Sequence, residues 1–309
     1  MKNGGGIKYI RHSEIDFEKW DHCIESALNG RVYAYHWHLD RTAVVWDALI
    51  YGDYEFVMPL PVKRKWGLKY VYQPLYCQQL GIFPAPTMEI AGMFYSKMIK
   101  NLRYVDIQIN SKNVSLPLRG KAEFIRRNNY LLNLDRKYQN ILSGYSKNTK
   151  RNIARAKSNH LGYIAGLRLE EYLDFKMTNN SLDIEKKEIN KLKSIIAFGL
   201  FKGFGEICGV YTAENKLCAA VYFYRWKNRV IYLNAVSDWE GKNLRAMFFL
   251  IDKYIESKAG QHLVLDFEGS MIPGLARFYS GFGATPETYY RFTYNRLSPL
   301  VNWLKRNIG

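Results

Sequence analysis

The second half of the chain presents an ordered series of helical and strand patterns that only a few folds can accommodate. Three runs of β-branched and aromatic residues are separated by the turn segments 213–216 and 226–229, which predicts an antiparallel meander. In order, the predicted elements are helices over 170–180 and 184–198, strands over 206–212, 217–224 and 230–236, a helix over 243–258, a strand over 262–267, a helix over 272–280 and a strand over 287–294. This order predicts an α/β (α+β) unit in which helices flank a mixed, mostly antiparallel sheet.

The first half of the chain repeats this pattern in a weaker form. Its predicted elements are helices over 15–28 and 88–101 and strands over 43–50, 54–61, 70–72, 104–109 and 124–134. The segment Tyr51-Gly52-Asp53, between the first two strands, is typical of a tight hairpin. A length of 309 residues also suits two domains. We therefore expect two tandem units, over 1–140 and 141–309, the second beginning with a basic helix at the junction.

Charge and composition restrict the partners and the compartment. The formal net charge of +17 favours an acidic partner, which could be nucleic acid, a phosphate-bearing ligand or an anionic membrane face. No apolar run reaches the roughly 18–20 residues that span a bilayer, so any membrane contact is expected to be peripheral. The N-terminus lacks an apolar signal core, and the four cysteines lie far apart. These features predict a cytoplasmic protein with reduced, buried thiols and no metal site.

The strongest local cluster of charge lies between the two predicted units. Residues 136–157 include seven Lys and Arg residues and no Asp or Glu. In a helix over 146–158 capped by Ser146, the basic residues occupy an arc of about 160°. These residues are Lys147, Lys150, Arg151, Arg155 and Lys157. The arc is either a phosphate-binding face or a solvated surface, and the lack of an acidic partner inside the helix argues against an ordinary salt-bridged surface.

Three stretches of the sequence resemble segments of the Fem family of tandem GNAT proteins. Residues 145–156 (YSKNTKRNIARA) are similar to the basic helix of that family, and residues 76–83 (YCQQLGIF) are similar to a first-domain segment of its compact FemAB-like branch. Residues 265–270 (LDFEGS), followed by 278–284 (FYSGFGA), resemble the second-domain D-F-x-G…F-Y-x-x-F-G-A pattern. The predicted element order is also that of the GNAT acyltransferase fold.

The resemblance implies an activity. Fem proteins are peptidyltransferases that add amino acids from aminoacyl-tRNA to the peptide of a cell-wall (peptidoglycan) precursor. We therefore expect transfer of an activated acyl or aminoacyl group to an amine, with no permanently bound cofactor and with tRNA or a nucleotide-linked precursor as the phosphate-bearing partner. Stable DNA binding is not expected. A CoA- or carrier-protein-dependent N-acyltransferase and a non-catalytic RNA-binding module remain alternatives.

One loop argues against CoA as the donor. Acetyl-CoA enzymes of the GNAT fold carry a glycine-rich loop at the position of residues 237–242, because backbone N–H groups must approach a diphosphate there. Here the loop has Gly241 as its only glycine, with Asp238 and Glu240 nearby. The negative charges oppose a diphosphate, so we expect weak binding of acetyl-CoA.

The candidate site residues follow from position and chemistry. Asp266 and Glu268 lie at the end of a strand before a helix, where ligands of open α/β sheets tend to bind, and either could act as a general base or cap the helix. Tyr222 and Tyr224 share one strand face, so one of them could be exposed and line a pocket, but core or rim packing is favoured. The predicted substrate-binding residues are Lys147, Lys150, Arg151, Arg155, Trp37, Lys63, Gln78, Gln79, Tyr222, Tyr232 and Ser270. Lys63 could instead lie at a solubilising hairpin end, and Tyr222 and Tyr232 could instead pack in the core.

Overall fold

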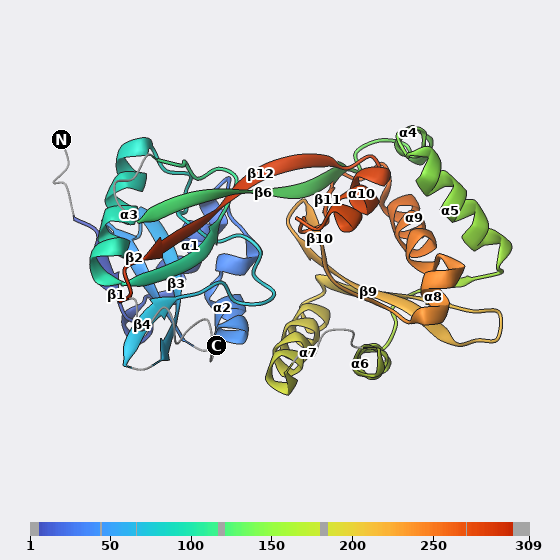
Figure 1. The fold of residues 1–309 in the computed structure, drawn as a ribbon, viewed down its shortest axis with the longest axis horizontal. Helices are drawn as coiled ribbons and strands as arrows, with labels where there is room; N and C mark the ends of the chain where they lie inside the picture. The colour runs from blue at the N-terminus through green and yellow to red at the C-terminus, as the bar shows by residue number, and fades with distance from the viewer. Residues whose placement is uncertain are drawn as a thin grey trace. The chain divides into compact units, whose positions relative to one another are not determined.

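The computed structural model describes residues 6–43, 45–65, 67–116, 121–179, 185–269 and 271–298 (Figure 1). The chain forms two compact units, one of Met1–Arg127 with Thr288–Gly309 and the other of Asn128–Glu287. The sequence placed a single boundary at 140/141, whereas this division falls inside strands β6 (Ala122–Asn133) and β12 (Thr285–Asn295). The chain returns to the first unit because the later residues of β12 pair with a strand of that unit, β5.

The first unit is a sheet in the strand order β1-β2-β3-β4-β5-β12-β6. β1 with β2, β2 with β3, β3 with β4 and β5 with β12 are antiparallel, whereas β4 and β5 run parallel. The helices are α1 and α2, which lie before the first hairpin, and α3 before β5. The bounds are β1 Lys8–Ile10, α1 Phe17–Ser26, α2 His36–Thr42, β2 Val45–Tyr51, β3 Phe56–Lys65, β4 Leu68–Val71, α3 Met88–Asn101 and β5 Tyr104–Ile109, with short 3-10 helices at His12–Glu14 and Val32–Ala34.

The second unit is a sheet in the order β6-β11-β10-β9-β8-β7, in which β10 and β11 run parallel and the other neighbouring strands are antiparallel. The bounds are α4 Tyr138–Ser143, α5 Lys147–Ser158, β7 Gly162–Ala165, α6 Leu169–Thr178, α7 Lys186–Phe201, β8 Gly205–Tyr211, β9 Leu217–Trp226, β10 Arg229–Ser237, α8 Trp239–Leu244, α9 Ala246–Lys258, β11 Val264–Asp266 and α10 Pro273–Gly281. The predicted order from helix 170–180 to the last strand is present in full. The predicted fold class, a mostly antiparallel sheet flanked by helices, is confirmed.

The core of the second unit is built from aromatic rings on one face of the meander. Phe223 of β9 stacks on Tyr254 of α9 with ring centroids 3.5 Å apart and planes 9° apart. Phe267 and Phe282 are buried in the same cluster. Because side chains alternate along β9, its tyrosines face the other side of the sheet. The four cysteines are buried and free, as predicted.

The predicted helix over 243–258 is two helices. It is interrupted at Arg245, whose φ of 63° is left-handed and ends α8 before α9 begins. The apolar spacing of α9 continues through this position, so periodicity alone does not reveal the break. The short elements β1, α2, α4 and β7 were also not predicted, because three to seven residues carry too little periodicity. Within the described residues, no helix combines the length and the apolar character needed to cross a bilayer.

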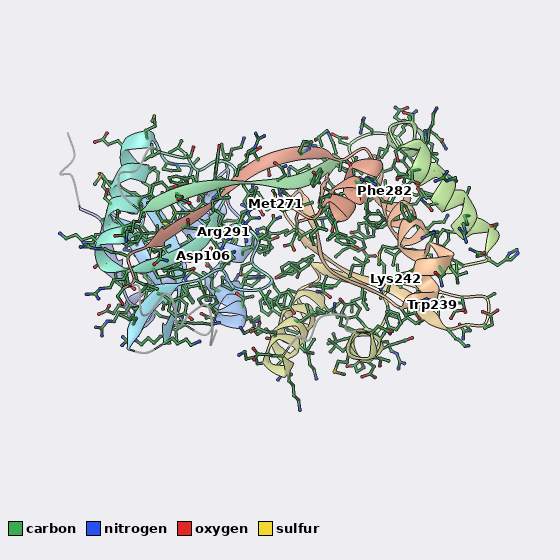
Figure 2. The ribbon with its side chains drawn as sticks, viewed as in Figure 1. Asp106, Trp239, Lys242, Met271, Phe282 and Arg291 are labelled. Atoms are coloured by element: carbon green, nitrogen blue, oxygen red, sulfur yellow. The ribbon has the colours of Figure 1, made fainter. Side chains whose placement is uncertain are left out.

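A charged pair fastens the returning strand to the first unit. Arg291 of β12 donates its Nε–H to Asp106 Oδ1 of β5 at 2.6 Å and a second guanidinium N–H to the other oxygen (Figure 2). We expect Arg291→Gln to lower the free energy of unfolding by about 1 kcal/mol, because a bidentate pair is lost at a partly exposed site. Urea denaturation at two salt concentrations measures this, and the loss should shrink at high salt. Arg296→Gln, at an exposed residue just beyond the strand, is the control; equal effects of both variants would contradict the assignment.

Candidate active site

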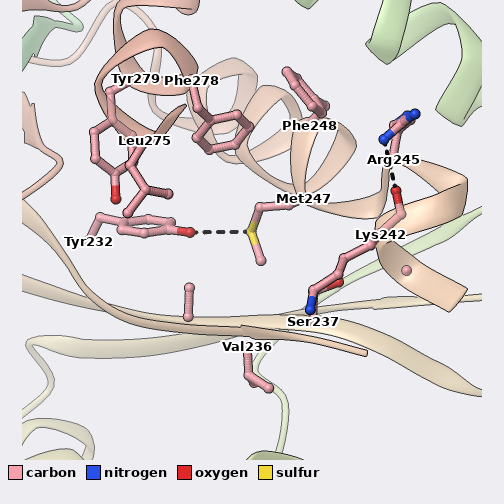
Figure 3. Close-up of a pocket in the computed structure, with 12 residues that line it drawn as sticks. Tyr232, Val236, Ser237, Lys242, Arg245, Met247, Phe248, Leu275, Phe278 and Tyr279 are labelled. Atoms are coloured by element: carbon pink, nitrogen blue, oxygen red, sulfur yellow. Dashed lines mark hydrogen bonds between the residues drawn. The ribbon is translucent and has the colours of Figure 1, made fainter. Parts of the chain in front are cut away.

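The second unit contains an opening where two parallel strands separate. β10 pairs with β11 only at Arg229, Val230 and Ile231, and β11 then ends whereas β10 continues to Ser237. On its other edge, β10 has a bulge between Tyr232 and Asn234 in its pairing with β9. A cavity of about 380 Å³, here called the β10 cavity, lies at this part of the strand (Figure 3). Its lining residues are Tyr232, Ala235, Val236, Ser237, Gly241, Lys242, Arg245, Met247, Phe248, Leu275, Phe278 and Tyr279.

The β10 cavity has two polar ends and an apolar middle. Figure 3 shows Tyr232 and Tyr279 together at one end and Lys242 and Arg245 at the other. Between them lie apolar side chains, among which Met247 receives a hydrogen bond from the Tyr232 hydroxyl at 3.3 Å. A ligand that fills the cavity therefore meets hydroxyl donors at one end and cations at the other.

The tyrosine end supplies groups that stay protonated. Tyr279 of α10 stacks on Phe267 with ring centroids 4.8 Å apart, and its own ring is 6.0 Å from that of Tyr232. Burial raises the pKa of Tyr279, and the negative charge of Glu268 raises it further. Burial also raises the pKa of Tyr232 well above its ordinary value. At neutral pH both hydroxyls can donate a hydrogen bond or a proton but do not act as bases.

The cationic end is centred on Arg245. This half-buried residue connects α8 to α9, and its Nη1 donates to the carbonyl of Lys242 at 3.3 Å. Its Nε is buried without a hydrogen-bond partner among the described residues. No carboxylate of the described chain forms an ion pair with it.

The loop 237–242 is held by a helix cap that its own Asp238 provides. Asp238 caps α8 by accepting the N–H of Gly241 at 2.6 Å. A Cβ on Gly241 would lie 2.1 Å from the carbonyl oxygen of Cys218, so packing against β9 explains this glycine. The Asp238 carboxylate is thus engaged at the start of α8, and the expected weak binding of acetyl-CoA stays a prediction.

The two predicted carboxylates lie beside the cavity and do not line it. Asp266 is 2% exposed; one of its oxygens pairs with Arg229 and the other accepts the Glu268 N–H at 2.9 Å. Glu268 is half-buried with a φ of 56°, and its charge acts on Tyr279. Of the two, Glu268 has the better position for proton transfer, and the catalytic role of both stays a prediction. Ser270 lies outside the described residues.

The predicted tyrosines of the meander lie on different faces of the sheet. Tyr232 lines the β10 cavity. Tyr222 and Tyr224 are both fully buried, so they belong to the core and neither is exposed. The reason is local: a Cβ on Gly199 of α7 would lie 2.1 Å from the Tyr222 hydroxyl, so the missing side chain leaves room for the ring beneath the helix.

The basic helix forms as predicted and belongs to the second unit. Ser146 caps it by accepting the Thr149 N–H at 3.1 Å, and its apolar side packs against α9. The four predicted ligand residues are exposed, and none has a carboxylate partner among the described residues; they are Lys147, Lys150, Arg151 and Arg155. Lys150 also lines a hollow of about 450 Å³ beside α4. The face is thus an uncompensated positive surface.

Lys157, the remaining basic residue of the helix, takes part in a buried polar cluster. Its Nζ lies 3.7 Å from an oxygen of Asp252 on α9, which is fully buried. The Tyr138 hydroxyl of α4 donates to the other oxygen at 2.7 Å. Burial raises the pKa of Asp252 despite these contacts. The cluster anchors α4 and α5 on α9.

The predicted residues of the first unit are mostly engaged in its own structure. Gln79 is 1% exposed, donates to Gln78 Oε1 at 2.9 Å and accepts the Ser111 N–H at 3.2 Å. Trp37 is half-buried on α2, with its ring 5.5 Å from that of Tyr35. Lys63 lies 4.0 Å above the ring of Tyr72 and lines a separate hollow of about 680 Å³.

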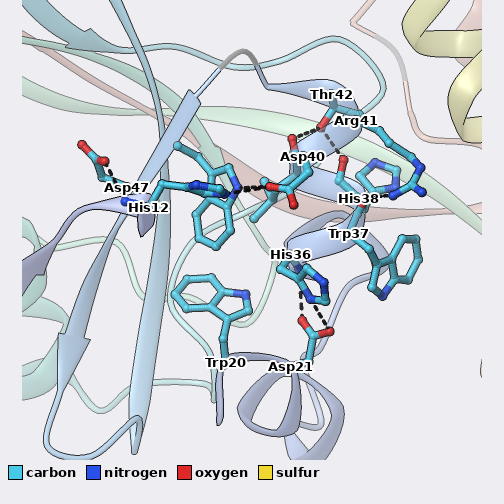
Figure 4. Close-up of polar contacts among 12 residues, drawn as sticks. His12, Trp20, Asp21, His36, Trp37, His38, Asp40, Arg41, Thr42 and Asp47 are labelled. Atoms are coloured by element: carbon cyan, nitrogen blue, oxygen red, sulfur yellow. Dashed lines mark hydrogen bonds and ion pairs between the residues drawn. The ribbon is translucent and has the colours of Figure 1, made fainter. Parts of the chain in front are cut away.

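Three histidines of the first unit are held by hydrogen bonds (Figure 4). His36 Nδ1 lies 2.6 Å from Asp21, and His12 Nε2 lies 2.9 Å from Asp40. Burial lowers the pKa of His38 to about 4, and its Nε2 lies 2.9 Å from the carbonyl of Tyr76. Among the residues that the structure describes, no group of three or more potential ligands could hold a metal ion.

Several residues of the β10 cavity were not predicted as ligands. Tyr279 and Phe278 were assigned to core packing from their helical spacing, which does not distinguish a cavity wall from a core. Lys242, Arg245 and Met247 carry no motif. The unusual backbone of Arg245, which would have singled it out, has no counterpart in the residue pattern.

Comparison with known proteins rests on structure. No family model matches the sequence, and no curated protein matches it. The solved structure of FemX covers 96% of this chain and 100% of its own, with a TM-score of 0.63 and 13% identity. This chain has the tandem GNAT fold. A tandem GNAT protein from the clavulanic acid biosynthesis pathway (TM-score 0.52, 12% identity, 93% of this chain and 97% of its own) and a GNAT acetyltransferase from Colwellia psychrerythraea (0.55, 11%, 94% and 99%) share it. The fold is therefore one that acyltransferases use.

The buried carboxylate of Asp252 predicts a dependence of stability on pH. Because the folded state raises this pKa above 3.8, the folded chain holds the proton more tightly than the unfolded chain. Stability contributed by the proton is complete below 3.8 and is lost as the pH rises through the raised value. We expect Asp252→Asn to be more stable than the wild type at pH 7, with an advantage that shrinks towards pH 4.

Urea denaturation between pH 4 and pH 8 measures this effect. The amide keeps an acceptor for Tyr138, so the cluster should survive. Asp174→Asn, at an exposed position on α6, is the control and should show no such trend. A difference between Asp252→Asn and the wild type that does not change with pH would contradict the raised pKa.

Proposed function

We propose that this protein transfers an activated acyl or aminoacyl group to an amine, with the donor carbonyl held in the β10 cavity. The observation that carries the proposal is the separation of β10 from β11 beyond Ile231, next to two protonated tyrosines. Strand edges without a partner present backbone N–H groups, which can polarise a carbonyl and stabilise the oxyanion that forms on it.

The chemistry needs one base and one acid. The acceptor amine attacks the donor carbonyl, and Glu268 accepts the proton that the nitrogen loses as the N–C bond forms. The bond between the carbonyl carbon and its oxygen or sulfur leaving group then breaks, and Tyr279 donates a proton to that leaving group. The proton returns from Glu268 to the tyrosine by way of solvent. Most of the rate enhancement comes from alignment of the two substrates.

The donor and acceptor are inferred from charge and resemblance. The uncompensated face of α5 supports a phosphate-bearing partner, and we propose tRNA or a nucleotide-linked precursor. The resemblance to Fem proteins supports aminoacyl-tRNA as donor and the peptide of a cell-wall precursor as acceptor. Because such substrates are cytoplasmic, we propose that the protein acts there. It needs no resident cofactor for this reaction.

Two alternatives make different demands. A CoA-dependent N-acyltransferase needs a diphosphate site, and the cap that Asp238 places on α8 opposes one; a carrier protein would avoid this difficulty. A non-catalytic RNA-binding module needs the face of α5 but neither Tyr279 nor Glu268.

Tyr279→Phe tests the catalytic part of the proposal. We expect the turnover number to fall about 100-fold or more, because the leaving group loses its proton donor, whereas the melting temperature should change little. The measurement is acyl transfer to primary amines from a panel of aminoacyl-tRNA, acyl-CoA and acyl-carrier-protein donors, followed by mass spectrometry.

Tyr254→Phe is the matched control, since it removes a buried hydroxyl that does not line the cavity. Its activity should equal that of the wild type. If Tyr279→Phe also retains full activity with the best donor, the acid role is wrong. Lack of transfer from every donor by the wild type would reject the enzyme and favour the binding module.

The face of α5 is tested by Lys150→Gln combined with Arg151→Gln. If both residues contact phosphates, affinity for bulk tRNA should fall and the salt slope should flatten by roughly one unit per lost contact. The fold should survive, because Gln is a good helix former and both residues are exposed. Titrations at four salt concentrations measure this.

A double variant of α7, Lys186→Gln with Lys193→Gln, removes the same net charge from another exposed helix. It should change the slope much less. Identical slopes for the two double variants would show that only net charge matters and would assign α5 to ordinary solvated surface.

A further inference from the structure

The end of helix α7 exposes apolar side chains that the fold does not use. Phe201, the last residue of the helix, is 83% exposed, and its neighbour Leu200 is 37% exposed. Phe201 makes no ring contact with another aromatic residue of the described chain. Single exposed apolar residues are common on protein surfaces, so a role for these two depends on what surrounds them.

A row of aromatic rings connects the end of α7 to the turn between β9 and β10. The Lys202 ammonium lies 5.6 Å from the centre of the Phe201 ring and 5.9 Å from that of Phe198. The ring centroids of Phe198 and Phe204 are 5.9 Å apart, and those of Phe204 and Trp226, the last residue of β9, are 5.3 Å apart. The end of α7 and the end of β9 therefore lie together. We call the following group the α7-end surface: Leu200, Phe201, Lys202, Trp226 and Lys227.

The charged groups of the α7-end surface are basic. Lys202 is exposed and forms no ion pair within the part of the chain that the structure describes, and Lys227 is exposed in the turn after Trp226. The segments 200–205 and 225–229 contain no acidic residue. Glu206, which follows the first segment, pairs with Lys258 at 3.0 Å. Aromatic, aliphatic and basic side chains thus share a surface that has no acidic residue of its own.

This combination of side chains suits the surface of an anionic membrane. Trp and Phe favour the zone between lipid headgroups and acyl chains, and lysines are attracted by anionic headgroups. Single-stranded RNA also stacks on aromatic rings, but it follows a positively charged groove and gains little from an aliphatic side chain such as Leu200. The exposed leucine beside Phe201 therefore favours lipid over RNA.

We propose that the α7-end surface docks the protein on an anionic membrane, with Phe201 and Leu200 inserted at the level of the headgroups and Lys202 and Lys227 beside the lipid phosphates. The contact is peripheral, because these few side chains bury little apolar surface compared with a membrane-spanning helix. The inference does not depend on the proposed transfer reaction, since no residue of the α7-end surface lines the β10 cavity.

Flotation of the full chain with lipid vesicles tests the partner. One set of vesicles is phosphatidylcholine alone, and the other is an equimolar mixture of phosphatidylcholine and phosphatidylglycerol. We expect the mixed vesicles to bind the protein about tenfold more tightly or better, with an affinity that falls as salt is added. Equal binding to both sets, or binding to neither, would overturn the proposal.

Two substitutions of Phe201 test the apolar part of the contact. Phe201→Gln should weaken binding to the mixed vesicles about tenfold, because the ring no longer leaves water on docking. Phe201→Trp should bind at least as tightly as the wild type. The melting temperature should change little in both variants, because the side chain is exposed. Leu28→Gln, at a fully exposed leucine of the first unit, is the control and should bind like the wild type.

A double variant tests the basic part of the contact. Lys202→Gln combined with Lys227→Gln should weaken binding to the mixed vesicles about tenfold and should reduce its dependence on salt. Lys100→Gln combined with Lys112→Gln removes the same charge from two exposed lysines of the first unit and should have a much smaller effect. Equal losses in the two double variants would show that only net charge matters and would overturn the proposal.

Titration with poly(U) distinguishes a membrane from RNA. If Phe201→Gln weakens binding of poly(U) and leaves vesicle binding unchanged, the α7-end surface binds RNA and the membrane proposal is wrong.

The transfer assay keeps this inference distinct from the proposed function. Phe201→Gln should transfer from soluble donors at the rate of the wild type. If vesicles bind through Phe201 but no donor supports transfer, the enzymatic proposal fails and the docking surface stands. If transfer occurs and neither set of vesicles binds, the enzymatic proposal stands and the docking surface fails.

Discussion

The end of the ladder between β10 and β11 at Ile231 is the constraint on which the rest of the second unit depends. Had the strands stayed paired, backbone hydrogen bonds would fill the space now lined by Tyr232 and Tyr279. Because β11 stops at Asp266, the chain turns away into α10, and this helix forms one wall of the cavity. The ion pair of Asp266 with Arg229 fixes the last paired position, so the predicted catalytic carboxylate has a structural role at the point of separation.

The polar groups around this opening are arranged by burial more than by pairing. The tyrosines keep their protons because they are removed from water, and the cation at the other end keeps an unmet charge because no acidic side chain lines the cavity. The affinity of such a site depends on the charge of the ligand. In contrast, the loop before α8 already contains its own anion, since Asp238 satisfies the Gly241 N–H.

Much of the architecture could be predicted from the sequence, because long segments carry the period of their element. The helix over 88–101 and the strand over 104–109 match α3 and β5 residue for residue, and the basic helix has the predicted cap and faces. Short elements such as α2 were not predicted, because a few residues carry too little periodicity. The interruption at Arg245 was not predicted either, because a left-handed backbone conformation does not change the spacing of apolar residues. The candidate site was predicted less well. Tyr232, a predicted substrate-binding residue, lines the cavity, but Tyr279 also lines it and was assigned to the core because of its helical spacing.

The pairing of β12 with β5 gives the order of synthesis a physical meaning. Nearly three hundred residues emerge before Arg291 and its neighbours can join β5, so during translation the first unit has an unpaired strand edge. The residues between, Asn128–Glu287, form a continuous segment that can become compact on its own in the meantime. In sequence, the second unit is an insertion into the first. The first unit is therefore synthesised first, but its sheet is completed last, when β12 pairs with β5.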